Sequence, residues 1–177
     1  RNASARALTF PFSYRKGQRE LAVSVYRTIS RRKRLFIQAP TGVGKTMSVV
    51  FPAVKAFGEG LGEKLFYLTA RTVTAQAARD AFAILQKQGL RLKRVFLTAK
   101  EKICPLEEPQ CDPEHCPYAR GHYDRVNEAV YTFLQNQDYG GREELLDWAE
   151  QYQVCPFAFS LDVSSFADAV VGDYNYA

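Results

Sequence analysis

Long apolar runs are missing from this 177-residue chain, and their absence excludes a membrane-spanning protein. No stretch approaches the roughly 18–20 apolar residues that a helix needs to cross a bilayer. A secretory leader is also missing, and the chain starts at Arg1 rather than at a methionine. We therefore expect a soluble, cytoplasmic piece of a longer protein, associated with the nucleoid if it is bacterial, without a membrane partner.

Internal repeats and low-complexity tracts are missing as well, which excludes solenoids and disordered linkers. Hydrophobic residues make up 46% of the chain, enough to build a core. A chain of this length fits one well-cored domain with an insert.

Acidic residues are scarce in the first part of the chain and abundant later. Residues 1–34 hold ten Lys or Arg and one acid, a net of +9, whereas residues 102–156 hold four basic and eleven acidic residues, a net of −7. A phosphate backbone would be drawn to the first segment and repelled by the second. This contrast argues against a simple DNA-binding finger in the later segment.

Hydrophobic periodicity predicts an alternation of helices and strands. Helices are expected over 18–33, 45–57 and 72–88, and short strands over 35–38, 64–69 and 94–98. The basic run Arg31–Arg34 ends the first helix, either as a solvated helix end or as a nucleic-acid contact. After Lys100 the composition changes, with helices expected over 118–136 and 143–153 and a strand over 167–172. The pattern predicts an α/β fold with a parallel sheet flanked by helices, interrupted by an insert.

The segment Ala39-Pro40-Thr41-Gly42-Val43-Gly44-Lys45-Thr46 has the spacing of a phosphate-binding loop, with Ala in place of the first Gly. The glycines let several backbone N–H groups face one anion, and the following helix adds its positive dipole end. Lys45 is expected to reach the β- and γ-phosphates of ATP, and the Thr46 hydroxyl to hold Mg²⁺.

Gln18 lies upstream, at the start of the first predicted helix. A glutamine amide can pair with both a donor and an acceptor on the edge of adenine. Its place in the chain resembles that of the adenine-reading glutamines of superfamily 2 helicases.

The four cysteines, Cys104, Cys111, Cys116 and Cys155, are separated by six, four and 38 residues. The C-x-x-C pair typical of zinc sites is missing, and disulfides fit poorly with an intracellular ATP-binding protein. Four thiolates suit an iron–sulfur cluster, and structural zinc or free thiols remain alternatives. His115 and His122 are expected to be surface or packing residues.

Together these features resemble the N-terminal part of the iron–sulfur DNA helicases of the XPD/DinG type, in superfamily 2. Matching blocks occur in the same order from Tyr14 to the end of the chain: Tyr14-Arg15-Lys16-Gly17-Gln18, the phosphate loop, Leu68-Thr69-Ala70-Arg71-Thr72, Leu97-Thr98-Ala99-Lys100, Cys116-Pro117-Tyr118, Val154-Cys155-Pro156-Phe157 and Ala167–Tyr176.

The resemblance implies a RecA-like motor lobe over 1–101 and 157–177 with a helical 4Fe–4S insert over 102–156. Such a protein is an ATP-dependent DNA helicase, works 5′→3′ on single-stranded or forked DNA, is expected to be a monomer and serves DNA repair or replication. The resemblance places Arg15 and Gln18 with Thr41–Thr46 at the nucleotide and Arg71 and Thr72 at the DNA backbone. It places Lys100 between cluster and DNA. Tyr118 and Tyr123 are expected to pack, with base stacking as the alternative.

The sequence departs from that family's pattern: no Asp-Glu-Ala-His motif occurs anywhere in it, and the second motor lobe with its arginines is missing too. We therefore expect the fragment alone to hydrolyse ATP negligibly, while the parent is an ATPase. The alternative is a non-catalytic iron–sulfur sensor of DNA damage or redox state. An iron–sulfur nuclease is a weaker alternative, because its carboxylate pair and Glu-x-Lys are missing.

Overall fold

The computed structural model describes residues 1–40, 42–70 and 72–176, without the side chain of Thr72. The chain divides into two compact units. The first comprises Arg1–Leu65 with Thr69–Arg91, and the second comprises Phe66–Leu68 with Leu92–Ala177.

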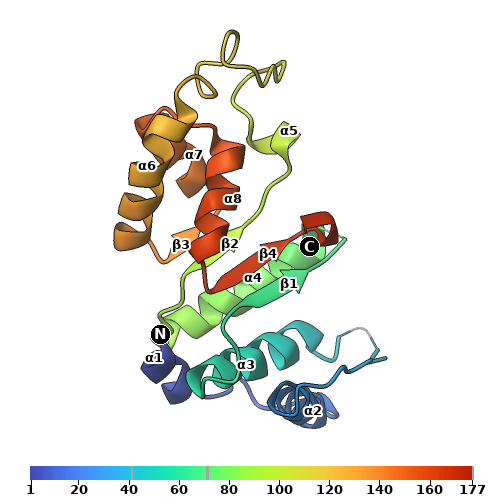
Figure 1. Ribbon diagram of the computed structural model, residues 1–177. Coiled ribbons are helices and arrows are strands. Elements are labelled where there is room, and N and C mark those ends of the chain that lie inside the picture. The colour runs from blue at the N-terminus through green and yellow to red at the C-terminus, as the bar shows by residue number, and fades with distance from the viewer. Residues whose placement is uncertain (41, 71, 177) are drawn as a thin grey trace. The chain divides into compact units, whose positions relative to one another are not determined.

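The first unit is a group of helices built around α3 (Lys45–Gly58), as Figure 1 shows. Helix α3 contacts α1 (Asn2–Ala7), α2 (Gln18–Ser30) and α4 (Thr72–Lys87). Its apolar side chains are buried, with Val50 and Val54 completely enclosed, as expected for a helix that is covered on several sides. The helices predicted over 18–33, 45–57 and 72–88 are confirmed, with small changes at their ends.

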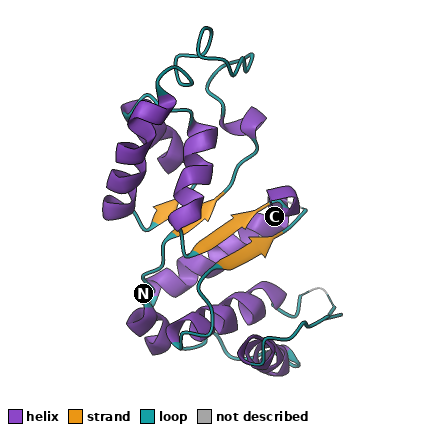
Figure 2. Cartoon of the chain, viewed as in Figure 1, coloured by secondary structure: helices purple, strands orange, loops and turns teal. Residues whose placement is uncertain are grey.

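The second unit holds a four-stranded sheet in the order β1-β4-β2-β3 (Figures 1 and 2). The strands are β1 (Leu65–Leu68), β4 (Ala169–Gly172), β2 (Arg94–Phe96) and β3 (Tyr139–Gly140). Strand β2 pairs in parallel with both neighbours, with Val95 opposite Gly140 on one side and Val170 on the other. The predicted α/β class with a parallel sheet flanked by helices is confirmed.

In the described part of the second unit the α-helices are α5 (Lys100–Ile103), α6 (His122–Asn136), α7 (Arg142–Gln151) and α8 (Pro156–Phe166), and a short 3-10 helix spans Tyr174–Tyr176. Helix α6 buries Val126, Ala129, Val130 and Phe133, the i, i+3, i+4, i+7 spacing of an amphipathic helix. The Phe133 ring meets Phe159 of α8 edge to face, with 5.7 Å between centroids.

Segment 102–156 shares one hydrophobic core with the strands around it. Residues of α6 and α7 belong to the same cluster as Val95 of β2 and Val170 of β4. Strand β3, inside that segment, forms an end of the sheet. The segment therefore contributes to one core together with the strands rather than forming a separate one.

The prediction of a buried strand over 35–38 is wrong in this structure. Residues 35–38 form no strand, and the side chain of Phe36 is 93% exposed. Strand structure needs a hydrogen-bonded neighbour, and none of the described strands pairs with this segment. Helix α8 and strand β3 were not predicted. None of the described helices is long and apolar enough to cross a membrane.

Candidate functional site

The phosphate loop of the first unit has the backbone that its glycines predict. Gly42 and Gly44 have φ angles of 87° and 80°, in the left-handed region that only glycine adopts without strain. Gly44 is the N-cap of α3, which starts at Lys45. The first N–H groups of α3 have no partner within the helix, so together with the helix dipole they favour an anion here.

Gln18 and Arg15 lie against this loop. The Nη1 of Arg15 donates to the Gly42 carbonyl at 2.5 Å, and the Nε2 of Gln18 donates to the Gly44 carbonyl at 3.4 Å. The Oε1 of Gln18 accepts from the Arg15 amide at 3.0 Å, and Gln18 is only 3% exposed. The structure thus brings both predicted residues to the phosphate loop, with the Gln18 amide bonded to the chain itself.

Lys45 folds back over the loop that precedes it. Its Nζ donates to the carbonyls of Ala39 and Pro40 at 2.9 and 2.8 Å. The side chain is exposed, so these bonds can be exchanged for phosphate oxygens without opening the core. Thr46 and Val43 are half-buried at the same turn. Thr41, also predicted here, lies outside the described residues.

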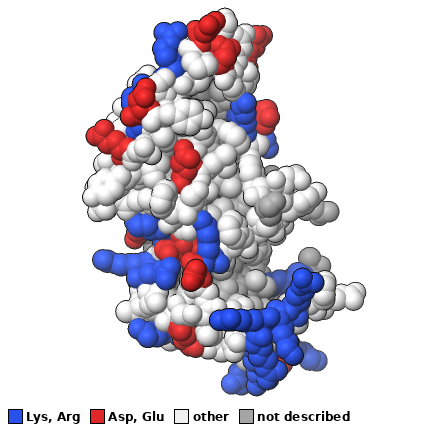
Figure 3. All heavy atoms as spheres, viewed as in Figure 1, with Lys and Arg blue, Asp and Glu red and all other residues white. Residues whose placement is uncertain are grey.

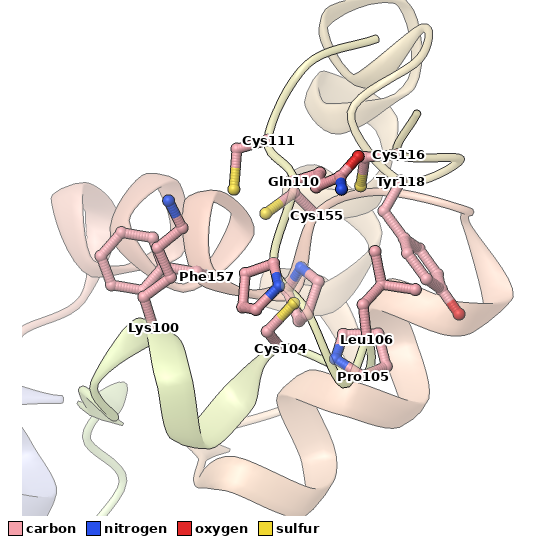
Figure 4. A pocket seen from close by; sticks show the side chains of 12 residues that line it. Lys100, Cys104, Pro105, Leu106, Gln110, Cys111, Cys116, Tyr118, Cys155 and Phe157 are labelled. Carbon is pink, nitrogen blue, oxygen red and sulfur yellow. The ribbon is translucent and has the colours of Figure 1, made fainter. Parts of the chain in front are cut away.

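The four cysteines of the second unit line one pocket, which encloses about 310 Å³ including its open mouth. Figure 4 shows their sulfur atoms arriving from separate segments. Cys104 follows α5, Cys155 is the N-cap of α8, and Cys111 and Cys116 come from the long loop between α5 and α6 (Figure 2). All four are free thiols, and Cys116 is buried whereas Cys111 is exposed.

A lysine and a helix N-terminus lie beside the cysteines of the pocket. The Lys100 ammonium hydrogen-bonds Cys111, and this bond, with the nearby Cys155 and Cys104, raises the pKa of Lys100. Cys155 lies at the positive end of the α8 dipole. A nearby cation and a helix N-terminus both stabilise a sulfur anion.

The spacing of the thiols bears on which metal they suit. Within the described residues, no three His, Cys, Asp or Glu side chains are arranged to hold one metal ion. A single zinc, with bonds of about 2.3 Å, needs sulfurs only about 3.8 Å apart. A 4Fe–4S cluster takes one thiolate on each of its irons and so accepts wider spacing. Within the described residues, the four thiols therefore line one pocket without forming a single-ion site.

The predicted DNA contacts are only partly described. Arg71 and the side chain of Thr72 lie outside the described residues, and Lys100 lines the cysteine pocket. Tyr118 also lines this pocket. Tyr123 is 85% exposed and its ring lies edge to face against His122, with 5.2 Å between centroids, so it packs at the surface.

The two histidines differ in their surroundings. His115 is exposed and its Nδ1 lies 2.8 Å from the Asp112 carboxylate, as expected of a surface residue. His122 is only 4% exposed, and its Nδ1 accepts the Cys155 amide hydrogen at 3.2 Å. Burial lowers the pKa of His122, against the opposing charge of Asp162. The sequence carried no signal for this contact, because 33 positions separate the two residues.

Comparisons with known proteins agree with this geometry. A probable ATP-dependent helicase of Methanocaldococcus jannaschii is 37% identical over 166 residues, which is 92% of this chain and 25% of that protein. The chain therefore spans about a quarter of the length of this relative. The DEAD/DEAH box helicase family matches residues 17–110, more than half of the chain, with the phosphate loop inside the match. The chain belongs to the DEAD/DEAH box helicase family.

Proposed function

We propose that this chain is the nucleotide-binding part of an ATP-dependent 5′→3′ DNA helicase that carries a 4Fe–4S cluster. The observation that carries the proposal is the gathering of all four cysteines around one pocket with Lys100, in a chain that also has a phosphate loop. The motif supports ATP binding, and the cysteine pocket supports the iron–sulfur class of helicase.

The phosphate loop supplies the contacts for the nucleotide. Backbone N–H groups at the start of α3 face the phosphates, and Lys45 exchanges the carbonyls of Ala39 and Pro40 for phosphate oxygens. Mg²⁺, held by Thr46, supplies charge neutralisation. Gln18 bonds Gly44, so a base bound at Gln18 is linked to the conformation of the loop.

The cysteine pocket joins segments that are far apart in the sequence. Cys104 directly follows α5, and Cys155 directly precedes α8. The loop from 104 to 121, by contrast, has little regular structure and few buried side chains. When bound, the cluster supplies four strong cross-links at this point. Lys100 lines the pocket, so its ammonium would offset part of the charge of a bound cluster and would be the pocket's cation for a DNA phosphate.

The partner we propose is single-stranded or forked DNA. The excess of basic residues over 1–34 supports binding to a phosphate backbone. Polarity and the roles of Arg71 and Thr72 follow from the resemblance to the XPD/DinG type alone.

The first test is a visible absorption spectrum, with iron, sulfide and zinc analysis, on protein purified without oxygen. We expect a brown protein with about four irons and four sulfides per chain. Cys111→Ser should lose iron and colour because one thiolate is gone. Glu107→Gln, an exposed change in the same loop outside the pocket, should keep both.

Each other outcome has a defined meaning. Colourless protein with one zinc per chain would overturn the cluster and leave a nucleotide-binding lobe with a structural finger. A cluster whose potential shifts on DNA binding, in a protein that does not bind ATP, would favour the sensor instead.

The chain by itself should hydrolyse ATP negligibly, because no Asp-Glu-Ala-His motif is present to hold Mg²⁺ and the attacking water. A phosphate-release assay checks this. Steady release that disappears in Lys45→Ala would contradict it.

A further inference from the structure

The bend that delivers Cys155 to the pocket is held in an uncommon conformation. Between α7 and α8 the chain turns at Gln153, whose φ of 54° lies in the left-handed region. Non-glycine residues are strained in this region and keep it only when neighbours enforce it. Val154, the next residue, is completely buried. Cys155 therefore follows a turn that the surrounding structure has to stabilise.

Arg125, in the first turn of α6, bonds this bend directly. Its Nε donates to the Tyr152 carbonyl at 3.1 Å, and one Nη donates to the Gln153 carbonyl at 2.5 Å. The same Nη reaches the Arg120 carbonyl at 2.7 Å. A guanidinium has a planar, rigid set of donors, so three such bonds fix the direction of the backbone. Gly121 leaves room for this, since a Cβ there would lie 2.5 Å from the guanidinium.

His122, three residues before Arg125, bonds the next backbone group in line. Its Nδ1 accepts the Cys155 N–H at 3.2 Å, so the ring is the tautomer with hydrogen on Nε2. Nε2 is buried and faces the Asp162 carboxylate at 3.7 Å, beyond hydrogen-bond distance. A buried polar atom that makes no hydrogen bond is destabilising. An apolar side chain would fill this space without that cost, so the Cys155 bond is what the histidine provides.

We propose that His122 and Arg125 are positioning residues that hold Cys155 as the fourth ligand of the pocket. This inference rests on the proposed function, because it concerns a cysteine assigned to the cluster. Cys155 is separated from Cys116 by 38 residues, so nothing in its local sequence places it beside the other three. Arg125 fixes the carbonyls of Tyr152 and Gln153 in the bend, and His122 fixes the amide of Cys155. The Cys155 side chain is then aimed at the pocket before any metal binds.

The first experiment compares two substitutions that separate hydrogen bonding from packing. His122→Asn keeps an acceptor near the place of Nδ1, whereas His122→Leu keeps the volume and removes the acceptor. Loss of a supporting residue around a metal site commonly costs 10–100-fold in metal affinity. We expect the Leu variant to lose its visible absorption to an iron chelator about 10-fold faster than the wild type, and the Asn variant to stay within about threefold. Tyr131→Leu, on the exposed side of α6, is the control and should not differ.

Two further readouts distinguish positioning from general stability. The midpoint potential of the cluster should shift in His122→Leu and return toward the wild-type value in His122→Asn, since a displaced ligand changes the cluster while a looser fold does not. Hydrogen exchange at the Cys155 amide should be faster in the Leu variant than in the Asn variant. Arg125→Gln should also release the cluster faster, because it loses most of its donors to the bend.

The outcomes separate the two proposals. If wild-type protein contains iron and His122→Leu retains it at the wild-type rate and potential, the positioning role is wrong and the proposed function stands. If wild-type protein contains no iron under anaerobic purification, the proposed function fails, and the assignment of these residues to a cluster ligand fails with it.

Discussion

At the residue scale, Lys45 is the side chain on which nucleotide binding depends most. It is exposed, and among the described residues its Nζ bonds the carbonyls of Ala39 and Pro40 in the phosphate loop. We expect Lys45→Ala to weaken ATP binding about 10–100-fold, as the loss of a hydrogen bond to a charged group does. Isothermal titration calorimetry measures this, with Lys87→Ala on the exposed face of α4 as the control. An unchanged dissociation constant would contradict the assignment of this loop.

Gly44 tests the link between Gln18 and the phosphate loop. Its φ of 80° is unfavourable for any side chain, and a Cβ there would collide with the Nε2 of Gln18. We expect Gly44→Ala to lower the free energy of unfolding by about 1–3 kcal/mol, measured by urea denaturation.

Two other glycines provide matched controls for this substitution. Gly60 has a φ of 74° but open space around it, so Gly60→Ala reports the backbone strain alone. Gly62 has neither constraint, and Gly62→Ala should be neutral or slightly stabilising. If Gly44→Ala lowers the free energy of unfolding no more than Gly60→Ala does, the Gln18 side chain does not restrict the space at Gly44.

At the scale of elements, the three longer helices of the second unit depend on one aromatic side chain. Phe133 of α6 is 2% exposed and meets both Trp148 of α7 and Phe159 of α8 edge to face. We expect Phe133→Ala to lower the free energy of unfolding by about 3–5 kcal/mol, through lost burial and the cavity left behind. Urea denaturation followed by circular dichroism measures it. Tyr131→Ala, 67% exposed on the same helix, should cost less than about 1 kcal/mol. Equal effects of the two substitutions would show that the core does not depend on this contact.

At the scale of the whole chain, the basic residues concentrate in the first segment of the sequence and the acidic residues in the later one. Figure 3 shows Lys and Arg gathered over α2 and the segment after it, where Arg27, Arg31, Arg32, Lys33 and Arg34 are all exposed. In the described part of the chain these side chains make no ion pair with an acid.

We expect DNA binding by this chain to depend on salt through that basic surface. Each contact with a phosphate of single-stranded DNA contributes about 0.7 to the slope of log K against log salt. Lys33→Gln with Arg34→Gln should therefore reduce the slope by up to about 1.4. Fluorescence anisotropy with a labelled oligonucleotide measures it, and Lys87→Gln with Arg91→Gln is the control. If the slope is unchanged in the Lys33→Gln, Arg34→Gln variant, the basic run Arg31–Arg34 is a solvated helix end and not a DNA contact.

Much of this organisation is local, and the amino-acid sequence by itself determined it. Helices α2, α3, α4, α6 and α7 were predictable because helical hydrogen bonds and apolar periodicity involve residues three or four apart. The phosphate loop was predictable for the same reason, since Gly42, Gly44 and Lys45 act within one turn.

Contacts between distant residues were decided only by the tertiary structure. Residues 35–38 have the composition of a strand, yet without a paired neighbour they form none. The sequence identified four cysteines, but the meeting of Cys155 with the other three depends on the packing of α6 against α8. The contact of His122 with the Cys155 amide depends on the same packing. Such pairings are set by the burial of a shared core and by loop closure over tens of residues, and neither leaves a periodic signal in the sequence.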